Sequence, residues 1–245
     1  WPEGFTESDT KDYYQTKYTT AEASTYYDPD YKLQISNIEL DFVESAVKKR
    51  GSLLDVGAGA GHFVDLARSR GWNARGVDLS FASEFVDQGT IDDVSGKFDA
   101  ITMWDVIEHV EDPESTILEA SEKLTKTGVL VIETGNYIST DRILNESTWW
   151  AFHPDHRWFH SPTVIENLLR KSGFNSIEFA KHNLRPNAET PTDYIGPSLF
   201  EFFIKALKRP HRIADYVRQF ADLKILVQRH SNLLNIGIFA ITARK

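Results

Sequence analysis

The sequence predicts an α/β fold, a doubly wound and mostly parallel sheet with helices on both faces. Three observations carry this prediction. Short apolar strand patterns alternate with helical patterns from Leu53 to Glu133, the first strand runs into three alternate glycines, and the second strand ends on Asp78. Strands that alternate with helices in this way join into a parallel sheet through right-handed crossovers.

Composition limits the classes of protein to which this chain can belong. With 245 residues the chain can bury one good core, so we expect one domain with elaborations. The net charge of −9 argues against a nucleic-acid partner, and the absence of cysteine excludes disulfides and thiolate metal sites. No apolar run approaches the roughly 18 residues of a membrane helix, and no signal sequence is evident. We therefore expect no membrane partner and a cytoplasmic location, with the natural start of the chain processed or lying upstream of Trp1.

The stretch around which the chain is organised runs from Leu53 to Phe63 and reads LLDVGAGAGHF. Its glycines remove side chains where the backbone turns tightly and approaches a ligand. A dinucleotide site needs the spacing G-x-G-x-x-G, whereas Gly57, Gly59 and Gly61 follow G-x-G-x-G. Asp55 ahead of them would repel a pyrophosphate and would suit a cationic ligand end. A glycine-rich turn of another α/β protein is the alternative.

A second acidic residue stands at the tip of the next strand, Ala74 to Asp78, and lies 21 positions after Gly57. A carboxylate in this register can accept both ribose hydroxyls of a nucleoside. A surface aspartate at a strand end is also common by itself. The register favours the ribose role.

These two features together resemble motif I and the following strand of the class I S-adenosylmethionine-dependent methyltransferases. The resemblance implies a Rossmann-like methyltransferase fold, a seven-stranded sheet whose last strand is antiparallel, and S-adenosylmethionine as cofactor. It implies that the cofactor is contacted by Asp55, Gly57, Ala58, Gly59, Gly61 and Phe63 in the turn, by Asp78 and Leu79 at the ribose, and by Thr90 and Ile91 at the adenine.

The connection to the third strand, Phe85 to Asp87, is too short for a standard crossover. A parallel crossover needs about a dozen residues, and only Leu79 to Ser83 are available. We therefore predict that residues are absent between Ser80 and Phe81.

The fourth strand, Phe98 to Met103, is followed by Trp104 to Val110. This run is similar to the motif after strand four in small-molecule O-methyltransferases of the ubiquinone-pathway and sugar-modifying branches. The similarity implies that Trp104, Asp105 and His109 lie beside the methionine part of the cofactor and the acceptor. On a helix, Asp105, Glu108 and His109 would share one face and could bind a divalent ion, as a comparable set does in ubiquinone-pathway enzymes. We favour the alternative, a capped and solvated first turn, and predict no metal.

The segment from Trp149 to His160 contains three histidines and five Trp or Phe rings beyond the fifth strand, Gly128 to Glu133. It is similar to the His-Pro-x-His-aromatic segment of a methyltransferase branch from polysaccharide and natural-product pathways. Zinc is not expected, because structural zinc usually takes four N or S ligands. The predicted acceptor residues are Trp150, His153 and His156. An imidazole with a pKa near 6.5 can accept a proton at neutral pH, so the candidate bases are His153 or His156, with His109 as the competing choice.

Four segments are expected along the chain: a cover and helix at 1–50, the methyltransferase core at 51–182, a helical insertion at 183–232, and the last core strand at 233–245. Within them we expect helices at Leu33 to Arg50, where Gly51 stops the helix, at Pro113 to Leu124, and after Ser161. The cover could bring Tyr14 or Tyr18 to the acceptor, or be a loosely packed tail. The insertion could be a lid or a homodimer arm, or a decorative surface pair of helices.

The sequence thus predicts an enzyme that transfers a methyl group from S-adenosylmethionine to a small-molecule or carbohydrate acceptor, most simply at oxygen with a histidine base. The alternatives are a noncatalytic S-adenosylmethionine-binding regulator and an N-methyltransferase. A nicotinamide-dependent oxidoreductase is disfavoured, because the glycine spacing lacks G-x-x-G.

Overall fold

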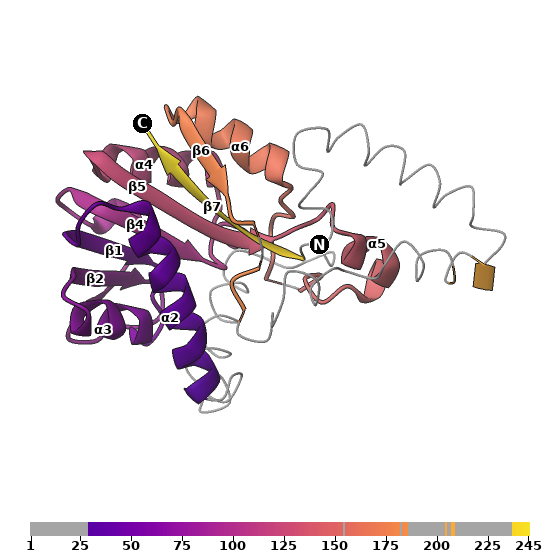
Figure 1. The fold of residues 1–245 in the computed structure, drawn as a ribbon, viewed down its shortest axis with the longest axis horizontal. Helices are drawn as coiled ribbons and strands as arrows, with labels where there is room; N and C mark the ends of the chain where they lie inside the picture. Colours follow the sequence, from indigo (N-terminus) through magenta and orange to yellow (C-terminus); the bar gives the residue numbers. More distant parts are fainter. Residues whose placement is uncertain (1–28, 154, 182, 186–203, 205–206, 209–236) are drawn as a thin grey trace.

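A computed structural model describes residues 29–153, 155–181, 183–185, 204, 207–208 and 237–245 of the chain (Figure 1). Tyr14 and Tyr18 lie outside these residues, as does most of the expected insertion at 183–232. The predictions of an acceptor-binding cover and of a lid or dimer arm therefore stay predictions.

The described residues form one seven-stranded sheet in the order β3-β2-β1-β4-β5-β7-β6. The strands are β1 (Ser52–Val56), β2 (Asn73–Asp78), β3 (Val86–Gln88), β4 (Phe98–Trp104), β5 (Leu124–Gly135), β6 (Ser176–Phe179) and β7 (Ile238–Arg244). The first five strands pair in parallel, whereas β7 pairs antiparallel with both β5 and β6. The predicted fold class, including its antiparallel last strand, is confirmed.

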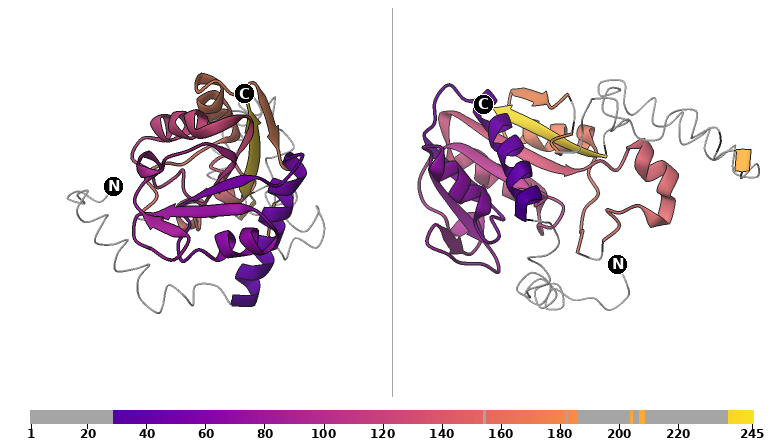
Figure 2. Two further views of the ribbon diagram at one scale, coloured as in Figure 1. Left: turned by 90° about the vertical axis from the view of Figure 1, so that its left-hand side faces the viewer. Right: turned by 60° about the horizontal axis from the view of Figure 1, so that its bottom comes forward.

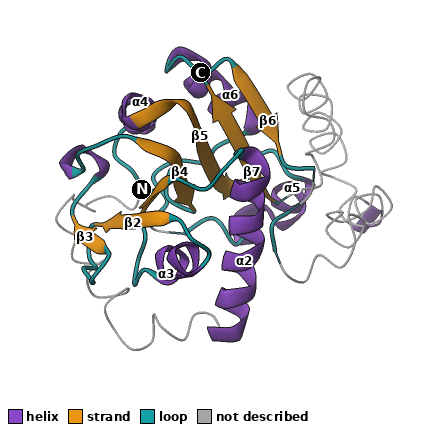
Figure 3. Cartoon of the chain, turned by 60° about the vertical axis from the view of Figure 1, so that its left-hand side comes forward, coloured by secondary structure: helices purple, strands orange, loops and turns teal. Residues whose placement is uncertain are grey.

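Helices cover both faces of the sheet (Figure 3). They are α2 (Pro29–Ala46), α3 (His62–Ser69), α4 (Pro113–Lys123), α5 (Thr140–Asn145) and α6 (Pro162–Lys171). Leu40 of α2 and Val64 of α3 belong to the apolar cluster on one face, whereas Ile117 of α4 and Leu169 of α6 belong to the cluster on the other. The short helix α5 lies beyond the carboxyl end of β5 (Figure 2).

The helix starts follow the local signals, but one predicted stop is wrong. Asp112 accepts hydrogen bonds from two amides of the first turn of α4, and Ser161 accepts one in α6. The first helix ends at Ala46 and not at Gly51. Gly51 has a packing role instead, because a Cβ there would lie 2.0 Å from Oδ2 of Asp99, which accepts a hydrogen bond from the Ser52 amide.

The connection from β2 to β3 consists of residues 79–85 and contains no helix. The amides of Ser80 and Phe81 both donate to Oδ1 of Asp78, at 2.8 and 3.1 Å. These two residues are consecutive in the sequence and lie in one tight turn, and β3 pairs with β2 through three residue pairs. That residues are absent between Ser80 and Phe81 stays a prediction.

Within the described part of the chain, the longest apolar helical stretches fall short of what is needed to cross a lipid bilayer.

Candidate active site

Four carboxylates stand in a row at the carboxyl edge of four adjacent strands. Asp78 ends β2, Asp55 precedes the last residue of β1, Asp105 follows β4, and Glu133 lies near the end of β5. The pairing of the strands in the order β2-β1-β4-β5 sets the order of the row. Ligands of open parallel sheets bind at this edge, where the strand order reverses between β1 and β4.

The three glycines after β1 have different tasks, although all three adopt left-handed φ values of 53 to 89°. A Cβ on Gly57 would lie 2.4 Å from Val106, and one on Gly61 would lie 3.0 Å from Val86. A Cβ on Gly59 would meet nothing within 4 Å. Two of the glycines therefore make room for the protein itself, whereas Gly59 faces open space that a ligand can enter.

Backbone amides fix the Asp78 carboxylate. Its Oδ2 accepts from the amide of Gly59 at 2.8 Å, and its Oδ1 accepts from Ser80 and Phe81. Each carboxylate oxygen has two lone pairs, so Oδ2 keeps one for a ligand hydroxyl, whereas Oδ1 already accepts from two amides. The structure places Asp78 at the predicted point, directly beside the turn.

The other residues predicted at the nucleoside lie in more varied surroundings. Leu79 is 61% exposed, whereas Ile91 is only 4% exposed and packs in the core, so only its backbone can face a ligand. The hydroxyl of Thr90 is within 3.1 Å of Asp93 in a capping box.

Phe63 contacts Trp104 edge to face, with ring centroids 5.5 Å apart. Nε1 of Trp104 is buried and has no hydrogen-bond partner among the residues that the structure describes.

Asp55 is buried below the turn and accepts a hydrogen bond of 2.6 Å from the Thr102 hydroxyl. Burial raises the pKa of Asp55 to about 7, the Thr102 hydrogen bond opposes this rise, and the charge of Asp78 adds to it. A cation placed nearby would favour the ionised form. That Asp55 suits a cationic ligand end stays a prediction.

Arg185 joins three elements at the far end of the acidic row. Its guanidinium nitrogens lie 2.7 Å from Glu133, 3.0 Å from Asp105 and 3.5 Å from Glu39 of α2. Burial raises the pKa of Glu133 to about 8, while the charge of Arg185 opposes the rise. Neither Arg185 nor Glu39 was a predicted site residue. The only signal was an acidic residue on the apolar side of a helix, since Glu39 stands four positions after Ile35 and four before Val43.

The predicted helical face of Asp105, Glu108 and His109 is wrong. Asp105 has a left-handed φ of 52°, and the Glu108 carbonyl accepts from the amides of Arg157 and Trp158 instead of from a following helical turn. The carboxylate of Asp105 contacts Arg185.

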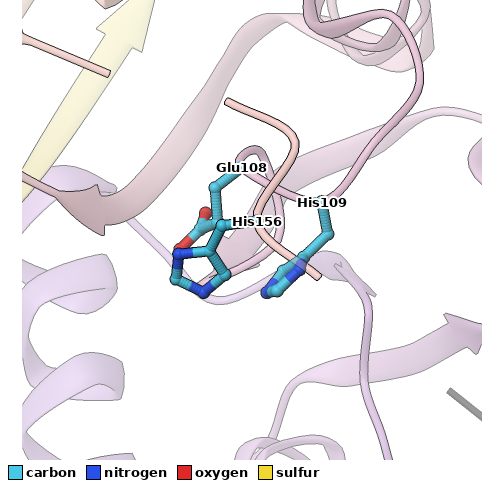
Figure 4. Close-up of side chains that lie close together, drawn as sticks. All are labelled: Glu108, His109 and His156. Atoms are coloured by element: carbon cyan, nitrogen blue, oxygen red, sulfur yellow. The ribbon is translucent and has the colours of Figure 1, made fainter. Parts of the chain in front are cut away.

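His156, from the segment after β5, joins Glu108 and His109 in the place of Asp105 (Figure 4). One ligand atom from each of the three residues lies within 4.8 Å of the others. Burial lowers the pKa of both imidazoles, to about 4 for His156, so both rings are neutral at pH 7. Two neutral imidazoles and a carboxylate are a donor set that fits a divalent ion. The prediction of no metal stays a prediction.

Asp155, which the sequence analysis did not select, organises the histidines. It is 1% exposed, and its carboxylate accepts a hydrogen bond from Nδ1 of His153. Its backbone oxygen lies 3.0 Å from Nδ1 of His109. An oxygen of either kind can only accept, so Nδ1 carries the proton in both rings and Nε2 has the lone pair.

Aromatic rings border this histidine group. His156 and Phe159 have ring centroids 6.4 Å apart, and Phe159 contacts Phe152 edge to face. The indoles of Trp149 and Trp150 both donate to Oδ2 of Asp141, which fixes their orientation. Trp150 is 50% exposed. The structure thus places His153, His156 and Trp150 in one aromatic surface beyond β5, and their role in binding an acceptor stays a prediction.

Comparison with known proteins gives three kinds of match. The family described as "Methyltransferase domain" matches residues 33–178. A ubiquinone biosynthesis O-methyltransferase of Dechloromonas aromatica is 29% identical over 43% of this chain and 55% of its own length, so this chain spans about half of that relative. A second protein of that name, from Marinobacter nauticus, is 27% identical over 67% of this chain and 82% of its own length.

The solved structures are related in fold alone. A methyltransferase from Archaeoglobus fulgidus, described as SAM dependent, superposes with a TM-score of 0.57 at 17% identity, covering 88% of this chain and 96% of its own. Phosphoethanolamine N-methyltransferase 2 of Haemonchus contortus, solved with S-adenosyl-L-methionine, gives 0.61 at 18% identity, covering 100% of this chain and 61% of its own.

Proposed function

Because this chain belongs to the methyltransferase domain family, we propose that it transfers a methyl group from S-adenosylmethionine to an oxygen of a small-molecule or carbohydrate acceptor. The observation that carries the proposal is the acidic row at the carboxyl edge, with Asp78 held beside the open space at Gly59. The ubiquinone-pathway relatives support oxygen as the accepting atom.

The residues present fit this cofactor. Asp78 offers a fixed carboxylate to a ribose diol, and Gly59 leaves room next to it. Buried Asp55 and the row beyond it offer negative charge to the ammonium and sulfonium of the methionine end. Nε1 of Trp104, which lacks a partner among the described residues, is a donor available at the same edge.

When bound, S-adenosylmethionine supplies an electrophilic methyl group on a sulfonium. The protein has to hold the acceptor hydroxyl in line with that group, exclude water and take the hydroxyl proton. The bound cofactor would supply the methyl group and keep the carbon–sulfur electron pair on its sulfur, so the residues of the chain would have to orient the hydroxyl and take its proton. The hydroxyl proton goes to a base of the protein.

His153 is the best placed base. Its Nδ1 is bound by Asp155, so Nε2 can accept a proton while the buried carboxylate stabilises the resulting imidazolium. His156 is less suited, because a pKa of about 4 makes it a weak base at neutral pH. His109 donates through Nδ1 to a neutral backbone oxygen, which stabilises an imidazolium less than a carboxylate does.

A direct test combines binding and turnover. Titration calorimetry should show binding of S-adenosylmethionine, and labelled methyl groups should pass to oxygen in a panel of phenols, sugars and amines. Binding without transfer to the panel or to a cell extract would indicate a noncatalytic regulator. Label on nitrogen would indicate an N-methyltransferase. Binding of NAD in place of S-adenosylmethionine would overturn the proposal altogether.

A further inference from the structure

Arg185 is a buried cation at a place where the fold otherwise gathers acids. It follows β6 in the chain, and its side chain is 10% exposed. It reaches Glu133 on β5, Asp105 after β4 and Glu39 on α2. Its position is therefore fixed from three sides. Leu184, next to it, is 3% exposed and packs with Ala180 and Ala240.

The acidic row runs across the carboxyl edge of the sheet from β2 to β5. Neighbouring strands lie about 4.8 Å apart, so the row from Asp78 on β2 to Glu133 on β5 spans three strand spacings, roughly 14 Å. A ligand whose ribose is held by Asp78 and which extends along the row brings its other end to β4 and β5. That end of the row is where Arg185 lies.

The methionine end of S-adenosylmethionine is a zwitterion. Its ammonium and sulfonium suit Asp55 and Asp105, but its α-carboxylate needs a cation or a set of N–H donors. The three carboxyl groups around Arg185 do not contribute three full negative charges against its one positive charge. Burial raises the pKa of Glu133 to about 8 and raises that of Glu39, which favours the neutral forms of both carboxyls, while the charge of Arg185 opposes the rise.

We propose that Arg185 binds the α-carboxylate of S-adenosylmethionine, with Glu39 and Glu133 holding its guanidinium in place. The proposal rests on the proposed function. It assigns the two charges of the amino-acid end to separate groups, the carboxylate to Arg185 and the ammonium to the acidic row. A planar guanidinium can bind a carboxylate through two parallel hydrogen bonds, which an ammonium group cannot do.

Binding of three ligands by the full chain tests this assignment. Calorimetry would compare S-adenosylmethionine and S-adenosylhomocysteine, which carry the carboxylate, with decarboxylated S-adenosylmethionine, which lacks it. R185Q should weaken the binding of S-adenosylmethionine and S-adenosylhomocysteine by roughly 10- to 100-fold, as expected for the loss of a charge-assisted pair. It should change the affinity for decarboxylated S-adenosylmethionine by less than about threefold. Arg170→Gln, which breaks the ion pair with Glu166 on α6, is the matched control and should change none of the three affinities.

The retained affinity for the decarboxylated ligand also reports that R185Q is folded. If R185Q proves too unstable to titrate, Arg185→Lys keeps the positive charge without the planar fork, and it should still weaken the carboxylate ligands selectively. Equal losses for all three ligands would make Arg185 structural and overturn the proposal. Tighter binding of S-adenosylmethionine to R185Q would also overturn it, because Arg185 would then compete for the site. A wild-type chain that binds none of the ligands would sink the proposed function itself.

Discussion

The backbone amide of Gly59 donates a hydrogen bond of 2.8 Å to Oδ2 of Asp78. This contact joins the turn after β1 to the tip of β2, two elements that the chain separates by the whole of α3. Because Oδ1 accepts from the next turn as well, the carboxylate is oriented before any ligand arrives. Ligand binding then orders little that is not ordered already.

Asp78→Ala should weaken S-adenosylmethionine binding by roughly 2 to 4 kcal/mol, because the ribose hydroxyls lose a charged acceptor. Calorimetry measures the loss, and a thermal melt shows how much the freed Gly59 amide costs the fold. Asp78→Asn is the matched variant, because it keeps the shape of the side chain but loses its charge. Its affinity for S-adenosylmethionine should lie between those of wild type and Asp78→Ala. An unchanged dissociation constant in Asp78→Ala would remove this residue from the site.

Gly59→Val should abolish cofactor binding while the protein stays folded, since the new side chain enters the open space beside Asp78. The left-handed backbone adds a strain of roughly 1 to 2 kcal/mol. Gly57→Val has similar strain, but it also meets Val106 at 2.4 Å, so it should lower the melting temperature much further. The prediction fails if Gly59→Val binds the cofactor normally, or if the two variants melt alike.

The fold could be predicted because its signals are local. The alternation of apolar strands and amphipathic helices, the glycine turn and the acid at the end of β2 each occupy a few consecutive residues. The rules for parallel crossovers then give a doubly wound sheet, whereas its antiparallel last strand was implied by the family resemblance. The same local reasoning located Asp55, Asp78 and the aromatic segment beyond β5.

The parts that could not be predicted depend on contacts between distant segments. Arg185 lies 80 positions from Asp105 in the chain, and no local pattern connects them. The spacing of Asp105, Glu108 and His109 suggested a helix, but the Glu108 carbonyl is taken by residues nearly 50 positions later. In the same way, spacing alone could not tell that a side chain on Gly57 would meet Val106 whereas one on Gly59 would meet nothing within 4 Å.

Asp55 should make stability depend on pH. Its pKa of about 7 in the folded state is above the ordinary aspartate value of 3.8, so the folded state binds this proton more tightly than the unfolded state does. The stabilisation is fully present below about pH 4 and is lost as the pH rises through about 7. Urea unfolding of wild type and Asp55→Asn at pH 4, 5.5, 7 and 8.5 measures the effect. The stability of wild type relative to the variant should fall over this range, by on the order of 4 kcal/mol at most. A constant difference would show that Asp55 titrates normally.

The base is tested by replacing His153, His156 and His109 separately with Gln. Each variant should bind S-adenosylmethionine within a few-fold of wild type, since the proposed nucleoside site is at Asp78 and Gly59, away from the three rings. His153→Gln should lower turnover by roughly 10²-fold or more, because its Nε2 is the nitrogen that Asp155 prepares to take a proton. Asp155→Asn should shift the pH profile of turnover, since a neutral amide no longer stabilises the imidazolium.

The assays are to be run with and without a chelator, because His109 and His156 also lie in the group that could hold a metal ion. Loss of turnover in the His109 and His156 variants that parallels the effect of the chelator on wild type would assign these two rings to an ion and leave His153 as the base. If all three variants turn over at the wild-type rate, no histidine takes the proton, and catalysis rests on holding the hydroxyl in line with the methyl group.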